Sequence, residues 1–382
     1  MGRFKNYFRD RRLIASVVVL AATSFFLVWN RAPLSYIAPE EQLALVPEEE
    51  KVIHIKTPES VRAIYMTSWV AGTKNLRENL VKFIDSSEIN AVVIDIKDYS
   101  GRVSFETDDS YIQELGASEN RIADIEDFIK YLHDKNIYVI GRISAFQDPY
   151  FVKTHPEMAV KKKNGSVWKD YKGLTWVDPA AKVFWNYVVL VAKESERAGF
   201  DELNFDYVRF PSDGNMRDIK YDYKDEKIQP SEVIKEFFGY LRRELDGVGV
   251  PLSADLFGMT TVNYDDLNIG QVLENAALYF DYISPMVYPS HYPTGFNNFK
   301  NPAMHPYEIV NQAMTVASER LIAASSTPSK LRPWLQDFDL GADYDAGMVR
   351  KQMQAVYDAG LTSWMVWDAG NKYTRDAYEA QN

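Results

Sequence analysis

Apolar stretches rich in β-branched and aromatic residues recur along the chain from residue 61 onward. They predict strands at residues 61–68, 91–97, 137–143, 202–209, 251–257, 282–288, 332–337 and 361–367. Between some of them, apolar residues recur at intervals of three and four, as one face of a helix requires. The two clearest sets are Ile122, Ile125, Phe128, Ile129 and Leu132, and Val233, Phe237, Leu241 and Leu245.

The alternation of strands and helices predicts repeated βα units around a parallel sheet. Eight strands favour an α/β fold of the closed (β/α)8 TIM-barrel type over residues 61–380. An open doubly wound sheet shares this local pattern, but no glycine-rich phosphate loop follows any of the predicted strands. Long insertions at residues 148–177, 212–229 and 290–305 follow strand carboxyl ends, where barrel enzymes build their sites.

The chain begins with a basic cluster and an uncharged apolar stretch. Residues 13–29 contain no charged side chain and are just long enough to span a bilayer as a helix. Residues 1–12 hold five basic residues against one acidic residue, a charge of +4 that predicts a cytoplasmic tail. We therefore expect a single-pass signal anchor in the cell membrane with the barrel outside the cytoplasm. A cleaved signal peptide and a buried soluble helix are the alternatives, although no convincing cleavage site follows Trp29.

Residues 30–60 have the composition of a spacer. They carry four prolines and the acidic run 48–50, with little apolar periodicity. Proline stiffens such a segment and like charges extend it, so it would hold the barrel away from the membrane.

Charge and cysteine content exclude several classes of function. The net charge is −11, so without the +4 of the first twelve residues the remaining 370 carry −15, which argues against a nucleic-acid partner. The absence of cysteine excludes disulfides, thiolate metal sites, a cysteine nucleophile and a lipid-modified cysteine. Aromatic residues make up 14% of the chain, which suits both a large core and a cleft that stacks on sugars.

Two aspartates interrupt apolar strands. Asp206 lies in the predicted strand 202–209 and Asp255 in the next one, 251–257. A carboxylate in a buried strand must be paired or functional, and adjacent strands lie about 4.8 Å apart, so the two side chains could flank one substrate bond. Glycoside hydrolysis needs such a pair as acid and as nucleophile or base. The alternatives are a structural pair between Asp206 and Arg209, and for Asp255 a metal-binding or structural role.

The second predicted strand ends in two more carboxylates. Asp98 is a further catalytic candidate if Asp255 is not the acid, and Asp95 is a candidate for binding substrate. Alternatively, Asp95 and Lys97 share one face of the strand and could form a buried ion pair.

Rings and hydrogen-bonding side chains gather at the remaining strand ends. Such residues could wall a sugar subsite, with ring faces against C–H groups and polar tips on hydroxyls. The candidates for binding substrate are Tyr207, Arg209, Tyr288, His291, Trp334, Gln336, Trp367 and Asn371. In two-residue alternation, Tyr207 and Arg209 would face away from Asp206.

Other chemistries lack their motifs. The five histidines show neither His-x-His nor His-Glu-x-x-His spacing, and the chain has no Gly-x-Ser-x-Gly elbow and no P-loop. We expect no metal and no cofactor.

Several motifs in order resemble one bacterial family. They are NAVVIDIKD at residues 90–98, FDYVRFP at 205–211, SADLFG at 253–258, IGQ at 269–271, SPMVYPSH at 284–291 and RPWLQD at 332–337. They are similar to a glycoside hydrolase family long classed as a domain of unknown function, over about residues 61–378. The resemblance implies a TIM barrel and glycoside-hydrolase-like chemistry, with an essential aspartate at Asp206.

The leading hypothesis is hydrolysis of an extracellular or cell-wall polysaccharide by Asp206 and Asp255. A non-catalytic barrel that binds polysaccharide at the cell surface is the first alternative, and a metal-dependent deacetylase or hydrolase is the second.

Overall fold

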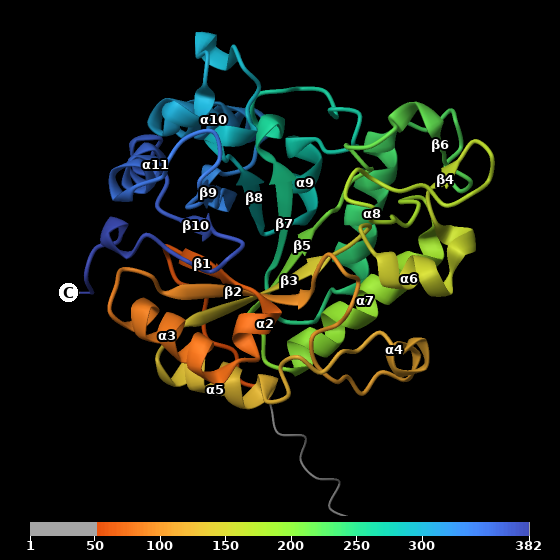
Figure 1. The fold of residues 1–382 in the computed structure, drawn as a ribbon, viewed down its shortest axis with the longest axis horizontal. Helices are drawn as coiled ribbons and strands as arrows, with labels where there is room; N and C mark the ends of the chain where they lie inside the picture. Colours follow the sequence, from red (N-terminus) through yellow and green to blue (C-terminus); the bar gives the residue numbers. More distant parts are fainter. Residues whose placement is uncertain (1–51, 382) are drawn as a thin grey trace, which may run out of the picture. The chain divides into compact units, whose positions relative to one another are not determined.

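Eight parallel strands form a closed barrel in the computed structural model, which describes residues 52–381. Figure 1 shows these strands at the centre of the domain, with helices around them. The barrel strands are β1 Arg62–Met66, β2 Ala91–Lys97, β3 Tyr138–Ser144, β5 Glu202–Asp206, β7 Leu252–Phe257, β8 Tyr282–Met286, β9 Trp334–Gln336 and β10 Trp364–Trp367. They pair in chain order, and β10 closes the barrel against β1.

The predicted TIM barrel is therefore confirmed, with all eight strands where the apolar pattern placed them. Strand ends differ from the prediction. β5 ends at Asp206, three residues earlier than expected, because Tyr207 adopts a left-handed backbone conformation with φ of 53°. A non-glycine residue in that conformation cannot continue a strand.

Most helices follow the strands and cover the outside of the barrel, whereas α4 Ser110–Leu115 and α6 Pro149–Thr154 lie in the long loops after β2 and β3. The others are α2 Ser68–Ala71, α3 Lys74–Asp85, α5 Ile125–Asp134, α7 Lys182–Arg197, α8 Pro230–Glu244, α9 Leu273–Tyr279, α10 Pro306–Ala323 and α11 Ala346–Asp358. The two helical spacings seen in the sequence correspond to α5 and α8, whose apolar residues are buried.

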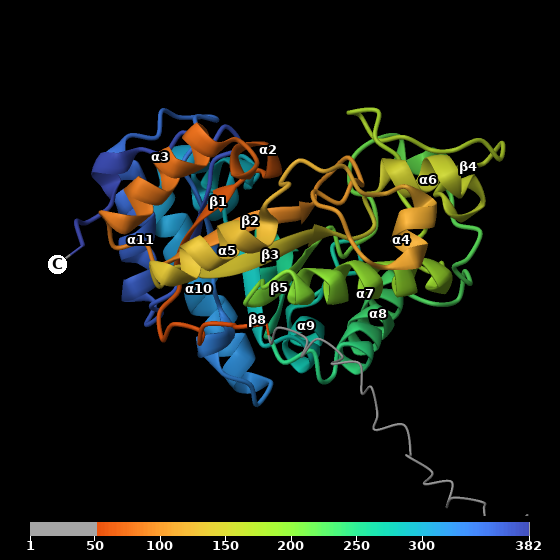
Figure 2. The same cartoon turned by 90° about the horizontal axis from the view of Figure 1, so that it is seen from below.

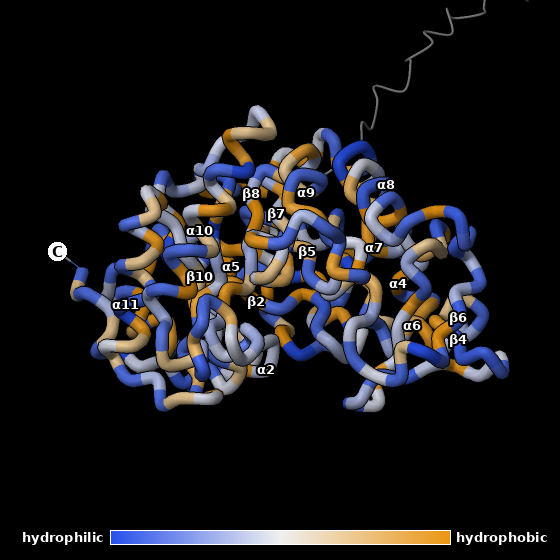
Figure 3. The backbone as a smooth tube through the Cα atoms, turned by 90° about the horizontal axis from the view of Figure 1, so that it is seen from above, coloured by the Kyte–Doolittle hydropathy of each residue, from blue (hydrophilic) through white to orange (hydrophobic). Residues whose placement is uncertain are grey.

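Apolar side chains pack in two layers. One layer fills the barrel interior and includes Val93, Ile140 and Met365, while a larger one lies between the strands and the helices. Figure 3 shows hydrophobic residues along the strands and polar residues along the outer loops. The barrel is thus a packed core that positions the ends of its strands.

Two of the predicted insertions meet each other. A short antiparallel pair joins β4 Lys161–Lys162 to β6 Ile219–Lys220, one from the insertion after β3 and one from the insertion after β5. Figure 2 shows β4, α4 and α6 on one side of the domain. This unpredicted pair ties the two loops into one wall beside the carboxyl ends of the strands.

The last residues of the predicted spacer lie against the amino-terminal end of the barrel. The amide of Ile55 donates to Asp201 Oδ1 at 2.8 Å, and the Thr57 hydroxyl is 3.1 Å from the hydroxyl of Tyr138. His54 Nε2 lies 3.0 Å from Glu196 Oε1. Residues 52–60 therefore belong structurally to the barrel.

The predicted basic tail (1–12), the membrane span (13–29) and most of the spacer lie outside the described residues. Within residues 52–381, no helix combines the length and the apolar character that crossing a bilayer would require.

Candidate active site

A cavity of about 880 Å³ lies at the carboxyl ends of the strands. This is the end of a TIM barrel at which enzymes carry their sites. Every barrel strand contributes to its lining, through Tyr65, Asp95, Arg142, Asp206, Asp255, Met286, Trp334 and Trp367. The cavity is therefore built by the barrel itself, and loops complete its rim.

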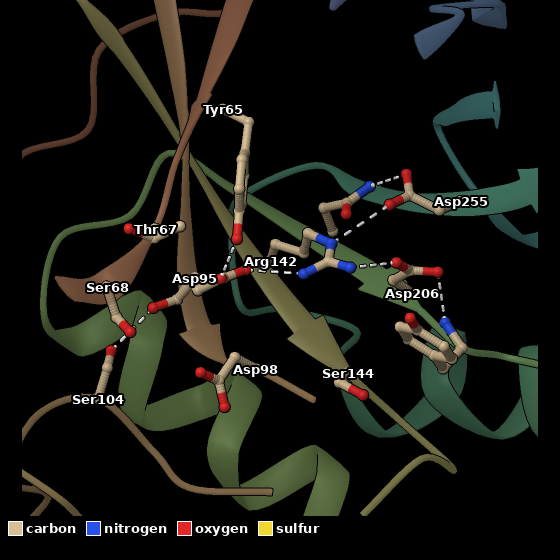
Figure 4. Close-up of polar contacts among 12 residues, drawn as sticks. Tyr65, Thr67, Ser68, Asp95, Asp98, Ser104, Arg142, Ser144, Asp206 and Asp255 are labelled. Atoms are coloured by element: carbon tan, nitrogen blue, oxygen red, sulfur yellow. Dashed lines mark hydrogen bonds and ion pairs between the residues drawn. The ribbon is translucent and has the colours of Figure 1, made fainter. Parts of the chain in front are cut away.

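Arg142 is the centre of the charged part of this cavity. From β3, its Nη1 donates to Asp95 Oδ1 at 2.7 Å, its Nη2 donates to Asp206, and its Nε lies 3.7 Å from Asp255 Oδ2. Figure 4 shows the guanidinium between the three carboxylates. Burial would lower the pKa of Arg142, but Asp206 and Asp95 raise it well above its usual value. The positive charge of Arg142 thus offsets the repulsion among the three buried carboxyl groups around it.

Asp255 is held at the floor of the cavity and is 1% exposed. Its Oδ1 accepts from Asn204 Nδ2 at 3.0 Å and from Trp334 Nε1 at 2.8 Å. Burial and the nearby charge of Asp206 raise its pKa to about 8. Both effects favour the protonated form of Asp255 at pH values where an ordinary aspartate is ionised.

Asp206 is the last residue of β5, and its carboxylate accepts at both oxygens. Oδ2 accepts from Arg142, and Oδ1 accepts from the backbone amide of Tyr207 at 2.6 Å. Asp206 and Asp255 each follow a residue of the register pair Phe205 and Ala254, so they stand side by side on adjacent strands. The predicted juxtaposition of these two aspartates is present.

Aromatic rings wall the side of the cavity next to Arg142. Tyr65 and Trp367 stack with centroids 3.8 Å apart and planes 18° apart, and Trp334 meets Trp367 edge to face at 5.6 Å. The Tyr65 hydroxyl donates to Asp95. Such ring faces suit the C–H surface of a sugar.

Four more predicted binding residues lie on the cavity lining. Tyr207, Arg209, Tyr288 and His291 all contribute to it. The strand alternation that turned Tyr207 and Arg209 away from Asp206 was wrong, since the strand ends before them. The alternative pairing of Asp206 with Arg209 is also wrong, because Arg142 is the partner of Asp206.

Asp98 does not line the cavity, which argues against the catalytic role predicted for it. Its Oδ2 accepts from Arg121 Nη1 at 2.6 Å, and its Oδ1 accepts from Ser100. In Figure 4 its carboxylate lies apart from Arg142. The expected alternative pair of Asp95 with Lys97 is absent as well, since Lys97 Nζ lies 2.8 Å from Asp148 Oδ2. An irregularity in the register of β2 with β3 between Asp95 and Lys97 separates the two side chains.

Gln336 and Asn371 also lie off the cavity lining and hold loops in place. Gln336 is fully buried and accepts from the amide of Ser290 at 3.2 Å. Asn371 accepts from the amide of Thr67 at 3.0 Å and donates to the carbonyl of Tyr65 at 3.0 Å. Asn371 therefore holds the backbone of two cavity residues, Thr67 and Tyr65, whereas Gln336 holds the loop that follows β8.

Sequence reasoning missed Arg142, Tyr65 and Asn204. Arg142 is a charged residue inside an apolar strand, the same signal that identified Asp206, and it was overlooked within 137–143. The structure describes no group of three or more acidic or histidine side chains arranged to hold a metal, and the Arg142 guanidinium occupies the space between Asp95, Asp206 and Asp255.

Solved structures share this architecture. The glycoside hydrolase domain of PgaB (BpsB) from Bordetella bronchiseptica is similar with a TM-score of 0.61 and 13% identity, covering 85% of this chain and 100% of that one. α-L-Fucosidase isoenzyme 2 from Paenibacillus thiaminolyticus has a TM-score of 0.56 and 12% identity, covering 83% of this chain and 48% of that one. At these identities the likeness shows the fold.

A hypothetical protein from Ruminiclostridium thermocellum ATCC 27405 is 37% identical, covers 54% of this chain and 98% of that one, and has a TM-score of 0.47. No curated protein matches the chain. The model of the family described as "Putative glycosyl hydrolase domain" matches residues 63–373, which span the barrel from β1 to beyond β10. The chain therefore belongs to this glycosyl hydrolase family and is, by class, a glycosidase.

Proposed function

We propose that the cavity hydrolyses glycosidic bonds of an extracellular or cell-wall polysaccharide, with Asp255 as the general acid and Asp206 as the nucleophile. The observation that carries the proposal is the contrast between two neighbouring carboxyl groups. Asp255 holds a proton at neutral pH, while Asp206 accepts hydrogen bonds at both oxygens. Environments that separate the protonation of two carboxyls assign the acid and its partner.

In the first step, Asp255 gives its proton to the glycosidic oxygen while an oxygen of Asp206 attacks the anomeric carbon. The carbon–oxygen bond breaks, the leaving sugar departs as an alcohol, and a glycosyl ester forms on Asp206. In the second step, Asp255 removes a proton from water, which attacks the same carbon and releases Asp206. Adjacent strands lie about 4.8 Å apart, close to the carboxyl separation of about 5 to 5.5 Å in retaining glycosidases.

The surrounding side chains support each step. Arg142 keeps its charge and binds the carboxylate of Asp206, which also stabilises that carboxylate as it leaves the ester. The stacked rings of Tyr65 and Trp367 offer a flat apolar face for a sugar ring beside the reacting carboxyls.

The test is a screen of the full chain against bacterial surface polysaccharides, with products identified by mass spectrometry. Asp206→Asn and Asp255→Asn should each lower kcat by at least a thousand-fold on a cleaved substrate and leave the fold intact. Asp98→Asn is the matched control, because this aspartate directly follows barrel strand β2 but does not line the cavity. In the wild type, kcat/KM should fall as the pH rises above about 8, where Asp255 loses its proton.

Three results would contradict the proposal. Near-normal turnover by Asp206→Asn on such a substrate excludes its role as nucleophile. Products of inverted anomeric configuration exclude the covalent step. Glycan binding by the wild type without any turnover would favour the non-catalytic barrel instead.

The basic cluster and the apolar stretch before residue 30 support placing this domain outside the cytoplasm, on a membrane anchor. Protease added to intact cells should then digest the barrel. A barrel that is fully protected, in cells whose surface proteins are digested, would refute this topology.

A further inference from the structure

Arg209 is a buried cation without an acidic partner in the described part of the chain. It is 7% exposed and lines the cavity next to Tyr207. Its guanidinium carbon lies over three rings, 4.8 Å from the centroid of Trp176, 5.3 Å from Tyr207 and 4.5 Å from Phe257. In the same cavity, Arg142 forms ion pairs with three aspartates. Arg209 forms none with any residue among 52–381.

Only one nitrogen of the Arg209 guanidinium has an acceptor. Nη1 donates to the carbonyl of Phe210 at 3.0 Å and to the hydroxyl of Ser212 at 3.1 Å, whereas the described chain supplies no acceptor for Nε or Nη2. Burial lowers the pKa of Arg209 below its usual value. Neither Nε nor Nη2 is among the buried atoms without a partner, so both donors are open to the cavity, where a ligand can bind them.

Asp206, Asp213 and Asp170 lie near enough to Arg209 to raise its pKa, but none of them forms an ion pair with it, and Asp206 and Asp170 are engaged elsewhere. Asp170 accepts from the amides of Lys172 and Leu174 at 2.9 Å each and from Trp176 Nε1 at 3.1 Å. Its hydrogen bonds shape the loop after β3, and that loop brings Lys172 to the cavity rim. The loop therefore keeps the Asp170 carboxylate bound to its own backbone and to Trp176, and it adds Lys172 as a second cation on the cavity lining.

Lys172 lies on the lining of the same cavity. Burial lowers the pKa of His291, and the nearby charge of Lys172 lowers it further, so the two residues lie near each other on the cavity lining. Lys172 forms no ion pair with any side chain that the structure describes. The Arg209 side of the cavity is thus cationic, although the chain as a whole carries −11.

The two arginines of the cavity differ in their acidic partners. Arg142 is surrounded by three aspartates of the barrel, while Arg209 points its free donors at the space that substrate would fill. A planar guanidinium with two free donors matches a carboxylate, which it binds through two parallel hydrogen bonds. The missing partner is therefore best supplied by the ligand.

We propose that Arg209, assisted by Lys172, binds an anionic substituent of the substrate, so that the polysaccharide is acidic and carries a carboxylate such as that of a uronic acid. This inference rests on the proposed function and specifies its substrate class. Sulfate shares the recognising chemistry, and the test separates it from a carboxylate.

The test measures binding, which does not depend on cleavage. The full chain with Asp206→Asn, which prevents turnover, is titrated calorimetrically with uronic-acid oligosaccharides of several linkages. Each oligosaccharide is paired with its carboxyl-reduced form, which keeps the linkages and loses the charge. Sulfated neutral oligosaccharides form a third arm.

We expect at least one acidic oligosaccharide to bind ten-fold or more tightly than its reduced partner. Adding Arg209→Met should reduce this preference to less than two-fold, because methionine keeps the packing against the rings and removes the donors. Arg209→Lys should retain part of the preference. Arg243→Met is the matched control, since it removes the same charge from the exposed surface of α8 and should leave the preference unchanged.

Several outcomes would overturn the inference. Equal binding of acidic and reduced forms, no binding of any acidic form, or a preference that survives Arg209→Met would leave Arg209 as a structural stack on Trp176 and Phe257. Tighter binding of sulfated than of carboxylated forms would overturn the carboxylate assignment. The proposed function fails on a different result: turnover that persists in the Asp206→Asn variant.

Discussion

Asp255 should make the stability of the barrel depend on pH in a direction opposite to that of most carboxyl groups. Its pKa rises from 3.8 to about 8 on folding, because burial and Asp206 disfavour its charged form. Its contribution to stability is complete below pH about 4 and is lost as the pH rises to about 8, because only the unfolded chain releases the proton in that window. Each pH unit removes about 1.36 kcal/mol from the free energy of unfolding. Between pH 5 and pH 8 the loss is roughly 4 kcal/mol.

Asp255→Asn removes this titration with little change of shape. The asparagine carbonyl can still accept from Asn204 and Trp334, the two donors of the native carboxyl. The wild type should lose roughly 4 kcal/mol of unfolding free energy between pH 5 and pH 8 through this group, and the variant should not. The difference in unfolding free energy, variant minus wild type, should therefore increase by roughly 4 kcal/mol over this range.

Urea denaturation followed by tryptophan fluorescence at pH 5, 6, 7, 8 and 9 measures this difference. Asp134→Asn, at the exposed end of α5, is the control and should show a constant offset from the wild type. An Asp255→Asn offset that is the same at pH 5 and pH 8 would refute the raised pKa, and with it the assignment of Asp255 as the acid.

Three further predictions follow from the geometry. Lys97→Met should destabilise the barrel by about 3 to 5 kcal/mol in thermal or urea unfolding, because it leaves Asp148 buried and unpaired, and adding Asp148→Asn should restore part of the loss. Trp367→Ala should raise KM for a cleaved glycan about ten-fold, or ~1.4 kcal/mol, with a smaller effect on kcat, and an unchanged KM would exclude ring stacking there. A fragment that starts at residue 52 should unfold cooperatively and be about 2 to 4 kcal/mol more stable than one that starts at residue 61, and equal stabilities would show that residues 52–60 contribute nothing.

The number, order and class of the strands could be predicted because each is an apolar run flanked by polar residues. The points where strands end could not, since they depend on single backbone conformations. Tyr207 has a positive φ, and nothing in the sequence FDYVRFP marks it as the residue that stops β5. That one residue decides that Arg209 lies on the cavity and not on the opposite face.

For the candidate site, too, residues within the strands could be predicted better than residues at the strand ends. Asp206 and Asp255 were found because a charge within a buried strand is conspicuous in any sequence. Asp98 and Asn371 lie beyond the ends of β2 and β10, where alternation no longer tells which way a side chain points, and Gln336 is the last residue of β9, a strand too short to set an alternation. Arg142 carries the same signal as Asp206, a charge within the apolar strand β3, and is therefore predictable from the sequence.

The docking of residues 52–60 beneath the barrel also sets where the domain can be attached to something else. Ile55 and Thr57 hold the beginning of the described chain at the amino-terminal end of the strands, and the cavity opens at the carboxyl end. A fusion partner, a dye or a solid support joined just before residue 52 would thus meet the face farthest from the cavity mouth. A domain immobilised in this orientation would keep the opening of its cavity accessible to a large polymer. The junction before residue 52 is therefore the natural point for coupling the protein to a sensor surface.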